Sequence, residues 1–304
     1  MTSFSTTDAA FEGFRVTRER PRALLVWAGF YLAINFLMPF LLVGLGGENL
    51  NALEAAAADP NVDTAQALKN VMALLPLYAV LIPIGLTVQS VMAAAVYRVV
   101  LRPEEKGFGF LRLGADELRL ILLTITYALI AVGVIFGVAL IAGLVAAAAA
   151  AVMGPAAGLA GLAIGIFALG MLLFGAVRLS LAPAITFAER RLSVLESWSM
   201  TRGQFWPMFA TYALATCSVL VVVMLALVIF TAVTAIATGG DLKAVQNMTQ
   251  PDMGSLGSYF TPRMIAYTAF GALLTAVYYA VVVAPAAVIY QRLKALRPSS
   301  LVEL

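Results

Sequence analysis

Six basic and aromatic residues between positions 178 and 206 are the best candidates for chemistry in this sequence. They are Arg178, Arg190, Arg191, Trp198, Arg202 and Trp206. A guanidinium group binds phosphate through charge-assisted hydrogen bonds, and a tryptophan ring favours the boundary between membrane and water. The combination therefore predicts a site that binds phospholipid headgroups.

The residues on which most enzymes rely are scarce. The chain has no histidine and one cysteine, Cys217, so the commonest general base and a thiolate metal site are both missing. No glycine-rich phosphate loop or nucleophile elbow is present. The adjacent acids Glu104-Glu105 and Asp116-Glu117 stand beside arginine and lysine, and we expect them to be solvated. These features predict a protein that is not an enzyme and holds no cofactor or metal.

The elements that must hold the candidate residues are long apolar helices. The sequence is 62% hydrophobic and 12% charged, and five stretches of it carry no charge at all. About 20 apolar residues cross a bilayer as a helix, and the longest stretch, between Arg119 and Arg178, is long enough to cross twice. We predict an all-α polytopic membrane protein with six transmembrane helices. They lie near residues 22–46, 71–98, 118–150, 156–188, 205–238 and 263–290.

The distribution of positive charge predicts the orientation. Of the 19 lysines and arginines, only Lys69, Lys243 and Arg263 fall outside one set of alternate loops and the two terminal segments. The positive-inside rule then places an N-terminal arm (1–21) and a C-terminal tail (291–304) in the cytoplasm, on either side of a transmembrane domain (22–290). We expect membrane phospholipids as partners, with a homo-oligomer or another membrane protein as a further possibility, and no nucleic acid.

Local signals predict several helix ends. Thr261 can cap the sixth helix, Asp116 the third, and Gly239-Gly240 can end the fifth. Ser193 and Glu196 have the spacing of a capping box, which predicts a short interfacial helix with an apolar stripe of Leu192, Leu195 and Trp198. Similar short segments, Phe11 to Arg22 and Phe108 to Arg119, precede the first and third spans. An Ala-rich helix around Leu53–Ala58 is predicted in the first outer loop.

Small residues predict where helices touch. Gly133 and Gly137 share one face of the third span, and Gly161 and Gly165 share one face of the fourth. Such faces allow close backbone approach. We expect them to pack within the chain, with dimerisation as the alternative.

A weak repeat suggests three helical hairpins. Three prolines lie about 100 residues apart in the even spans, and each has Gln or Glu six positions later: Pro83 with Gln89, Pro183 with Glu189, and Pro285 with Gln291. The hypothesis is that each even helix returns with a proline kink. Chance is the competing explanation, since prolines are common in membrane helices.

Arg178 is the one charge that the spacing places within a span. A charge at the bilayer centre costs at least about 2.5 kcal/mol on insertion scales, so it needs a partner or an exit. Three alternatives remain open. In the first, the span ends near Leu181, Pro183 starts an interfacial segment, and the Arg178 side chain extends to lipid phosphates. In the second it meets a helix-end carbonyl or a tyrosine, and in the third it forms part of a ligand site.

The stretch around Arg178 also resembles a known family. The run Arg178-Leu-Ser-Leu-Ala-Pro183, followed by Glu196-Ser-Trp198 and Thr201-Arg-Gly-Gln-Phe-Trp206, is similar to the signature of the bacterial glycerophosphodiester phosphodiesterase membrane-domain family and its YciC-type relatives. The resemblance implies a multi-helix protein of the bacterial inner membrane. The phosphodiesterase activity belongs to members fused to a catalytic barrel, which these residues do not contain, so the resemblance implies no enzyme.

Together these features predict a non-enzymatic inner-membrane protein that serves in envelope or lipid homeostasis or as a membrane assembly partner. The alternative is a transporter or channel for lipid or another amphipathic anionic molecule. The spans carry no acidic residue, which disfavours ion-coupled transport. A membrane enzyme is the third and weakest hypothesis.

Overall fold

The computed structural model describes residues 4–58, 64–105, 107–153, 157–240, 257 and 260–296, and no strand occurs among them. The elements are α1 (Thr6–Glu19), α2 (Pro21–Ala58), α3 (Thr64–Ala73), α4 (Leu75–Leu101), the 3-10 turn η1 (Phe108–Phe110), α5 (Ala115–Met153), α6 (Ala157–Leu179), α7 (Ala182–Glu189), α8 (Glu196–Met200), α9 (Phe205–Ala237) and α12 (Pro262–Ala295).

Six stretches are long and apolar enough to cross a membrane, which confirms the all-α polytopic fold. They are Pro21–Leu42, Leu75–Leu101, Phe108–Ala149, Gly161–Glu189, Phe205–Ala237 and Pro262–Ala295. The predicted Ala-rich helix at Leu53–Ala58 is the end of α2 and not a separate element. The outer segment before Thr261 lies largely outside the described residues.

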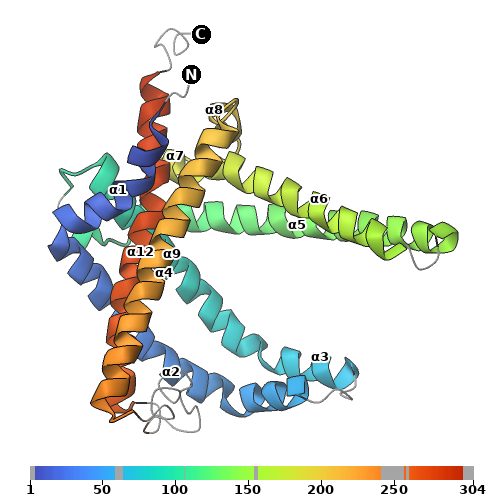
Figure 1. Ribbon diagram of the computed structural model, residues 1–304, viewed down its shortest axis with the longest axis horizontal. Coiled ribbons are helices and arrows are strands. Elements are labelled where there is room, and N and C mark those ends of the chain that lie inside the picture. Colours follow the sequence, from blue (N-terminus) through green and yellow to red (C-terminus); the bar gives the residue numbers. More distant parts are fainter. Residues whose placement is uncertain are drawn as a thin grey trace.

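Consecutive spans contact each other in pairs, α2 with α4, α5 with α6 and α9 with α12, but α12 also packs along α2 and α4, so the first and third pairs form one bundle. The pairs diverge from a common base, so that the α5–α6 pair points away from the α9–α12 pair (Figure 1). We use "base" for α1, η1, α7 and α8 together with the ends of the spans that meet them. The start of α1 and the end of α12 both lie at this end of the molecule (Figure 1).

The three repeated prolines are not equivalent. Pro83 and Pro285 lie inside the continuous helices α4 and α12, whereas Pro183 lies in the first turn of the separate helix α7. Proline has no N–H to bond the carbonyl four residues earlier, and α6 ends at that residue, Leu179. The fourth span is therefore not one continuous kinked helix. The chain breaks there into two helices, as expected for the alternative in which the span ends near Leu181 and Pro183 starts a new segment.

The centre of the molecule is α12, which contacts α1, α2, α4, α7 and α9. Ala272, Ala276, Ala280 and Ala284 repeat every four residues, so they share one face, and all four are buried. This face packs beside Trp27 of α2 and residues of α4. Small side chains let these helices approach closely, as is common between membrane helices.

The closest helix crossing joins α1 to α12 at Gly13. A Cβ atom added to Gly13 would lie 2.2 Å from the Cα of Val281. At Gly133, Gly137, Gly161 and Gly165, by contrast, an added Cβ would meet no atom within 4 Å. The prediction that these four glycines pack within the chain is therefore wrong, because their faces of α5 and α6 are turned away from every other described helix.

Predicted helix ends are confirmed where the signal is local. Thr261 Oγ1 accepts a hydrogen bond from the backbone N–H of Met264 at 3.2 Å. Gly239 and Gly240 have φ of +68° and +86°, and Gly240 N–H donates to the carbonyl of Ala235. Both are the backbone geometries that these residue types favour.

Asp116 does not cap the third span. The helix α5 begins one residue earlier, at Ala115, so Asp116 lies inside its first turn. Its carboxylate is used instead in ion pairs with Arg102 and Arg119.

Candidate functional site

The end of α6 is capped by two hydroxyl groups from α8 and the turn after it. Because the helix stops at Leu179, no backbone N–H of α6 reaches the carbonyl of Arg178. Ser197 Oγ donates to this carbonyl at 2.7 Å, and Thr201 Oγ1 lies 3.2 Å from it, although its shorter bond, at 2.7 Å, is to the carbonyl of Ser197. Both side chains are fully buried. These two residues, which the sequence interpretation missed, hold α8 against α6.

The side chain of Arg178 is covered by aromatic rings. Its guanidinium carbon lies 4.8 Å from the ring centre of Trp198 and 5.9 Å from that of Phe174. Only 7% of Arg178 is exposed, its Nε has no hydrogen-bond partner, and no carboxylate of the described chain lies within ion-pair distance. Of the three alternatives considered, the burial fits a side chain with a partner inside the chain, and that partner is the face of a tryptophan.

An aromatic cluster continues from this arginine to the start of α9. Phe174 contacts Trp198 at 5.7 Å and Phe205 at 5.1 Å, and Phe205 contacts Trp206 at 5.3 Å between ring centres. Trp206 itself is 73% exposed. Tryptophan and tyrosine collect at membrane–water boundaries, so such a cluster is typical of the level at which helices enter a bilayer.

The remaining predicted site residues do not join Arg178. Arg190 ends α7 in the left-handed conformation, with φ of +54°, and its guanidinium lies 3.5 Å from Glu105. Arg191 pairs with Glu189 and Glu196, and its hydrogen bond with Glu189 raises the pKa of Arg191. Arg202 is exposed and makes no ion pair with any described residue. The four candidate arginines therefore divide into one covered by aromatic rings, two in ion pairs and one that is exposed.

The predicted capping box and apolar stripe are wrong. The helix α8 begins at Glu196 after Leu195, whose side chain makes no capping hydrogen bond. Ser193 instead bonds directly to the carboxylate of Glu196 at 3.1 Å. Leu192 and Leu195 precede the helix and are both exposed.

A buried ion pair lies where α4 meets α5. Arg98 and Glu117 are 2% and 1% exposed, and Arg98 Nη2 contacts a carboxylate oxygen of Glu117. Arg98 Nη1 also donates to the carbonyl of Phe110 at 2.8 Å. The prediction of solvated acids is therefore wrong for Glu117, because α4 ends and α5 begins at the same level and bring the two charges together.

Glu105 is shared by four arginines. Its oxygens lie 3.9 Å from Arg98, 3.6 Å from Arg102, and 3.5 Å from both Arg112 and Arg190. Arg98 has Glu117 as a second partner and Arg102 has Asp116. Arg112 and Arg190 thus depend on one carboxylate between them, and this part of the base carries an excess of positive charge.

The loop between α4 and α5 is fixed by contacts from α2. Trp27 Nε1 donates to the carbonyl of Gly109 at 2.6 Å. Gly109 has φ of +59°, and an added Cβ would lie 2.5 Å from Val26, so only glycine fits there. Arg20 lies over the ring of Phe110 at 5.5 Å.

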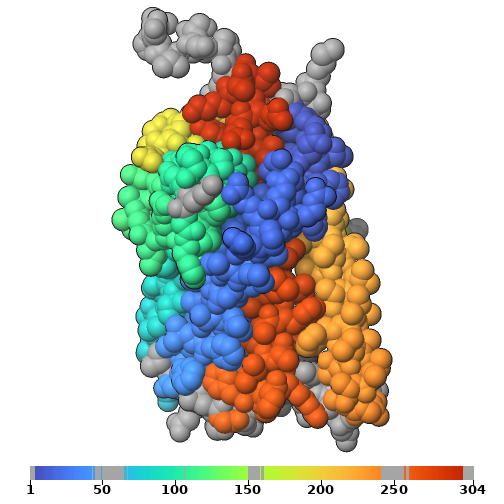
Figure 2. Space-filling view, turned by 90° about the vertical axis from the view of Figure 1, so that its left-hand side faces the viewer, coloured from blue at the N-terminus to red at the C-terminus, as the bar shows by residue number. Residues whose placement is uncertain are grey.

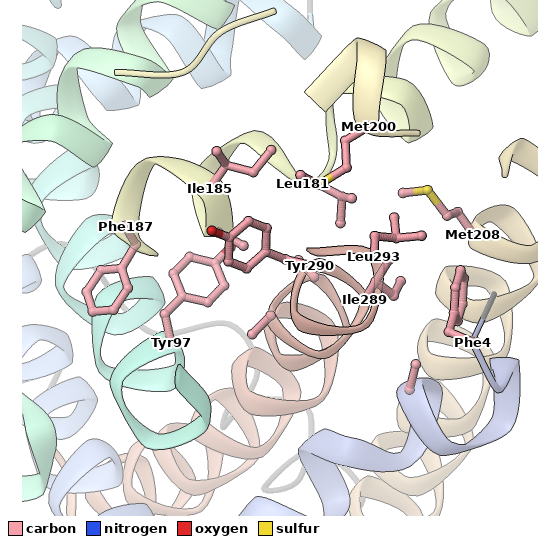
Figure 3. Packing of buried hydrophobic residues seen from close by; sticks show 14 of the residues in the cluster. Phe4, Tyr97, Leu181, Ile185, Phe187, Met200, Met208, Ile289, Tyr290 and Leu293 are labelled. Carbon is pink, nitrogen blue, oxygen red and sulfur yellow. The ribbon is translucent and has the colours of Figure 1, made fainter. Parts of the chain in front are cut away.

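The base also contains the largest buried apolar cluster. Side chains from α4, α7, α8, α9 and α12 converge in it, as Figure 3 shows for Tyr97, Ile185, Met200, Met208 and Ile289. At its edge Glu189 accepts a hydrogen bond from Tyr290 at 3.1 Å and from Lys294 at 3.4 Å, which joins α7 to α12.

A cavity of about 340 Å³ lies where the helix pairs diverge. It is bounded by α4, α5, α7 and α12, and its polar lining includes Gln89, Ser90, Tyr97, Thr124 and Tyr127. None of its lining residues is charged.

Within the described residues, no group of three or more histidine, cysteine, aspartate or glutamate side chains could hold a metal ion. Comparison with known proteins gives no match for this chain to a protein-family model, a curated protein or a solved structure.

Proposed function

We propose that this chain is a non-enzymatic protein of the bacterial inner membrane that binds anionic phospholipid at its cytoplasmic base and serves in lipid or envelope homeostasis. The observation that carries the proposal is the surface of the base, where unneutralised arginine lies beside exposed apolar rings and chains. Phe108, Leu113 and Trp206 are each more than 70% exposed there. Such a surface suits a leaflet rich in anionic lipid, to which each nearby Lys or Arg adds about 1 kcal/mol of attraction.

The orientation follows from the same surface. The start of α1, the end of α12 and most arginines belong to the base, so the positive-inside rule favours a cytoplasmic base. Arg190, Arg191 and Arg202 would then face the headgroups, while Arg178 and Trp198 sit just below them and anchor α6.

The test is the lipid preference of the purified protein. We reconstitute the chain into nanodiscs of phosphatidylglycerol or of phosphatidylcholine and measure the midpoint of thermal unfolding in each. We expect a higher midpoint in phosphatidylglycerol, and the difference should shrink in high salt because surface charge is screened. Equal midpoints at low salt would overturn the proposal.

A lipid transporter is the second candidate, and the cavity between the diverging pairs favours it. Its hydroxyl and amide groups lie at the junction of three spans, where a headgroup would have to leave the leaflet. Proteoliposomes with a fluorescent phospholipid in both leaflets test this idea, since dithionite bleaches only the outer leaflet. Complete bleaching would support transport, whereas bleaching that stops at half would exclude it.

A further inference from the structure

A second cavity, larger and almost wholly apolar, lies between α2 and α4. It encloses about 640 Å³, and its walls include Ile34 and Leu37 of α2 and Ile84 and Val88 of α4. All four belong to helices long and apolar enough to cross a membrane, so we expect this part of the groove to lie in the hydrocarbon region. Volumes of this size accommodate lipid-sized and drug-sized ligands.

One end of the groove is charged. The loop between α4 and α5 closes this end with Phe108, Leu111, Arg112 and Leu113. In Figure 2 the loop (teal to green) lies beside α2 (blue) at the base, and α2 contacts η1 directly. The groove therefore runs from the charged surface of the base into the apolar part of the molecule.

The loop residues around Arg112 have the composition of a membrane-binding surface. Phe108 and Leu113 are 80% and 77% exposed, although they are large and apolar and lie outside the regular part of the spans. The side chain of Arg112 is about half exposed.

The ion pair between Arg112 and the carboxylate of Glu105 is weak. The distance to Glu105 is 3.5 Å, and Arg98, Arg102 and Arg190 approach the same group. A guanidinium that shares one carboxylate with three others keeps most of its attraction for a further anion. A phosphate at the mouth of the groove would meet that attraction.

We infer that this groove binds an anionic phospholipid, with one acyl chain between α2 and α4 and the phosphate held by Arg112. The inference rests on the proposed function and names the site for it. Between Phe30 and Leu37 the groove follows about 10 Å of α2 at 1.5 Å per residue. This length takes up a large part of one leaflet of a bilayer whose hydrocarbon core is about 30 Å thick. Apolar walls below a single cationic mouth match the shape of a phospholipid, which has one charged end.

The experiment uses the full chain in nanodiscs that contain phosphatidylglycerol with a photoreactive diazirine in one acyl chain. After irradiation, the labelled peptides are identified by mass spectrometry, and a phosphatidylcholine probe serves as the reference. We expect phosphatidylglycerol to label the groove faces of α2 and α4 more than phosphatidylcholine does. Arg112→Ala should reduce this labelling about fivefold, the factor that corresponds to one surface charge.

Two further variants distinguish lipid binding at the groove from general effects of a substitution on folding or surface charge. Glu105→Gln removes the competing carboxylate and should increase labelling of the groove, a gain that misfolding would not produce. Arg263→Ala removes an exposed arginine at the far end of α12 that makes no ion pair with the described residues, and it should leave the groove labelling unchanged. Circular dichroism melting of each variant measures whether it is folded.

The outcomes distinguish this inference from the proposed function. Labelling of the groove that falls in Arg112→Ala and rises in Glu105→Gln supports the site. A preference for phosphatidylglycerol that maps to other spans and ignores both variants overturns the site but leaves the proposed function standing. Equal labelling by both lipids throughout the chain overturns both.

Discussion

The base and the outer part of the α5–α6 pair differ in how much of each helix is buried against other helices. In the most apolar 18-residue stretch of α12, half of the residues are buried inside the chain. In the corresponding stretch of the third span, which contains α5, none is buried. At the base, helices are joined by the Arg98–Glu117 pair, the hydroxyl caps on α6 and the crossing at Gly13. Beyond its first turns, α5 lies beside α6 alone among the described helices (Figure 1).

The difference shows what holds helices together in a bilayer. Lipid tails are as apolar as leucine, so an apolar helix gains little by leaving lipid for another apolar helix. Association depends instead on close backbone contact and on polar groups that need partners. The base has both, and the outer part of α5 and α6 has apolar side chains that lipid solvates equally well.

The largest expected effect is at the buried ion pair. Glu117→Ala leaves Arg98 buried without its carboxylate, and we expect a loss of about 3–5 kcal/mol of unfolding free energy. Unfolding by SDS from mixed micelles measures it. The double variant Arg98→Met with Glu117→Leu should recover most of the loss. A single-variant loss below that of an ordinary surface substitution would contradict a structural role for the pair.

The next effect is at the closest helix crossing. Gly13→Ala places a methyl group 2.2 Å from the Cα of Val281, which forces α1 away from α12. Overpacking of this kind costs about 1–3 kcal/mol. Limited proteolysis of α1 measures the displacement. The matched control is Gly137→Ala, where the added Cβ meets nothing, and equal protection of both variants would argue against the crossing.

A smaller effect is expected at the hydroxyl cap of α6. Ser197→Ala removes the shorter hydrogen bond to the carbonyl of Arg178, at a cost of about 1 kcal/mol. The accompanying loosening of α8 should expose Trp198, so its fluorescence emission should move to longer wavelength. Ser199→Ala is the control, because Ser199 is exposed and bonds only within α8. A shift of the same size in both variants would count against the cap.

The smallest effect is expected on the outer part of the pair. Phe136→Leu exchanges one lipid-facing apolar residue for another, and the change in unfolding free energy should stay within about 0.5 kcal/mol. The same SDS titration measures it. A loss of 2 kcal/mol or more would mean that this face contacts protein, as in an oligomer of the chain. The outer part of the pair would then not be solvated by lipid alone.

Some features were predictable because the signal is local. Thr261, Gly239 and Gly240 end helices through bonds to residues no more than five positions away, and each was predicted correctly. The apolar stretches predicted the six spans, since crossing a bilayer requires only length and hydrophobicity.

The candidate site was predictable only in part. Arg178 and Trp198 were both recognised, but their contact was not, because it requires α8 to fold back onto the end of α6. Glu117 was predicted to be solvated because adjacent charged residues in a loop are usually exposed. Its burial depends on Arg98, which is 19 residues earlier and comes from the opposite side of the loop.

By itself, then, the sequence determined that this chain is an all-α protein with six membrane-crossing helices, because hydrocarbon leaves an isolated backbone no other way to satisfy its hydrogen bonds. Tertiary structure decided which charges are buried, where helices touch and which arginines remain available to an anion. Those outcomes depend on how helix ends from distant parts of the chain meet. In a uniformly apolar sequence no local pattern predicts which helix ends will contact each other. A few polar groups and one glycine determine these contacts.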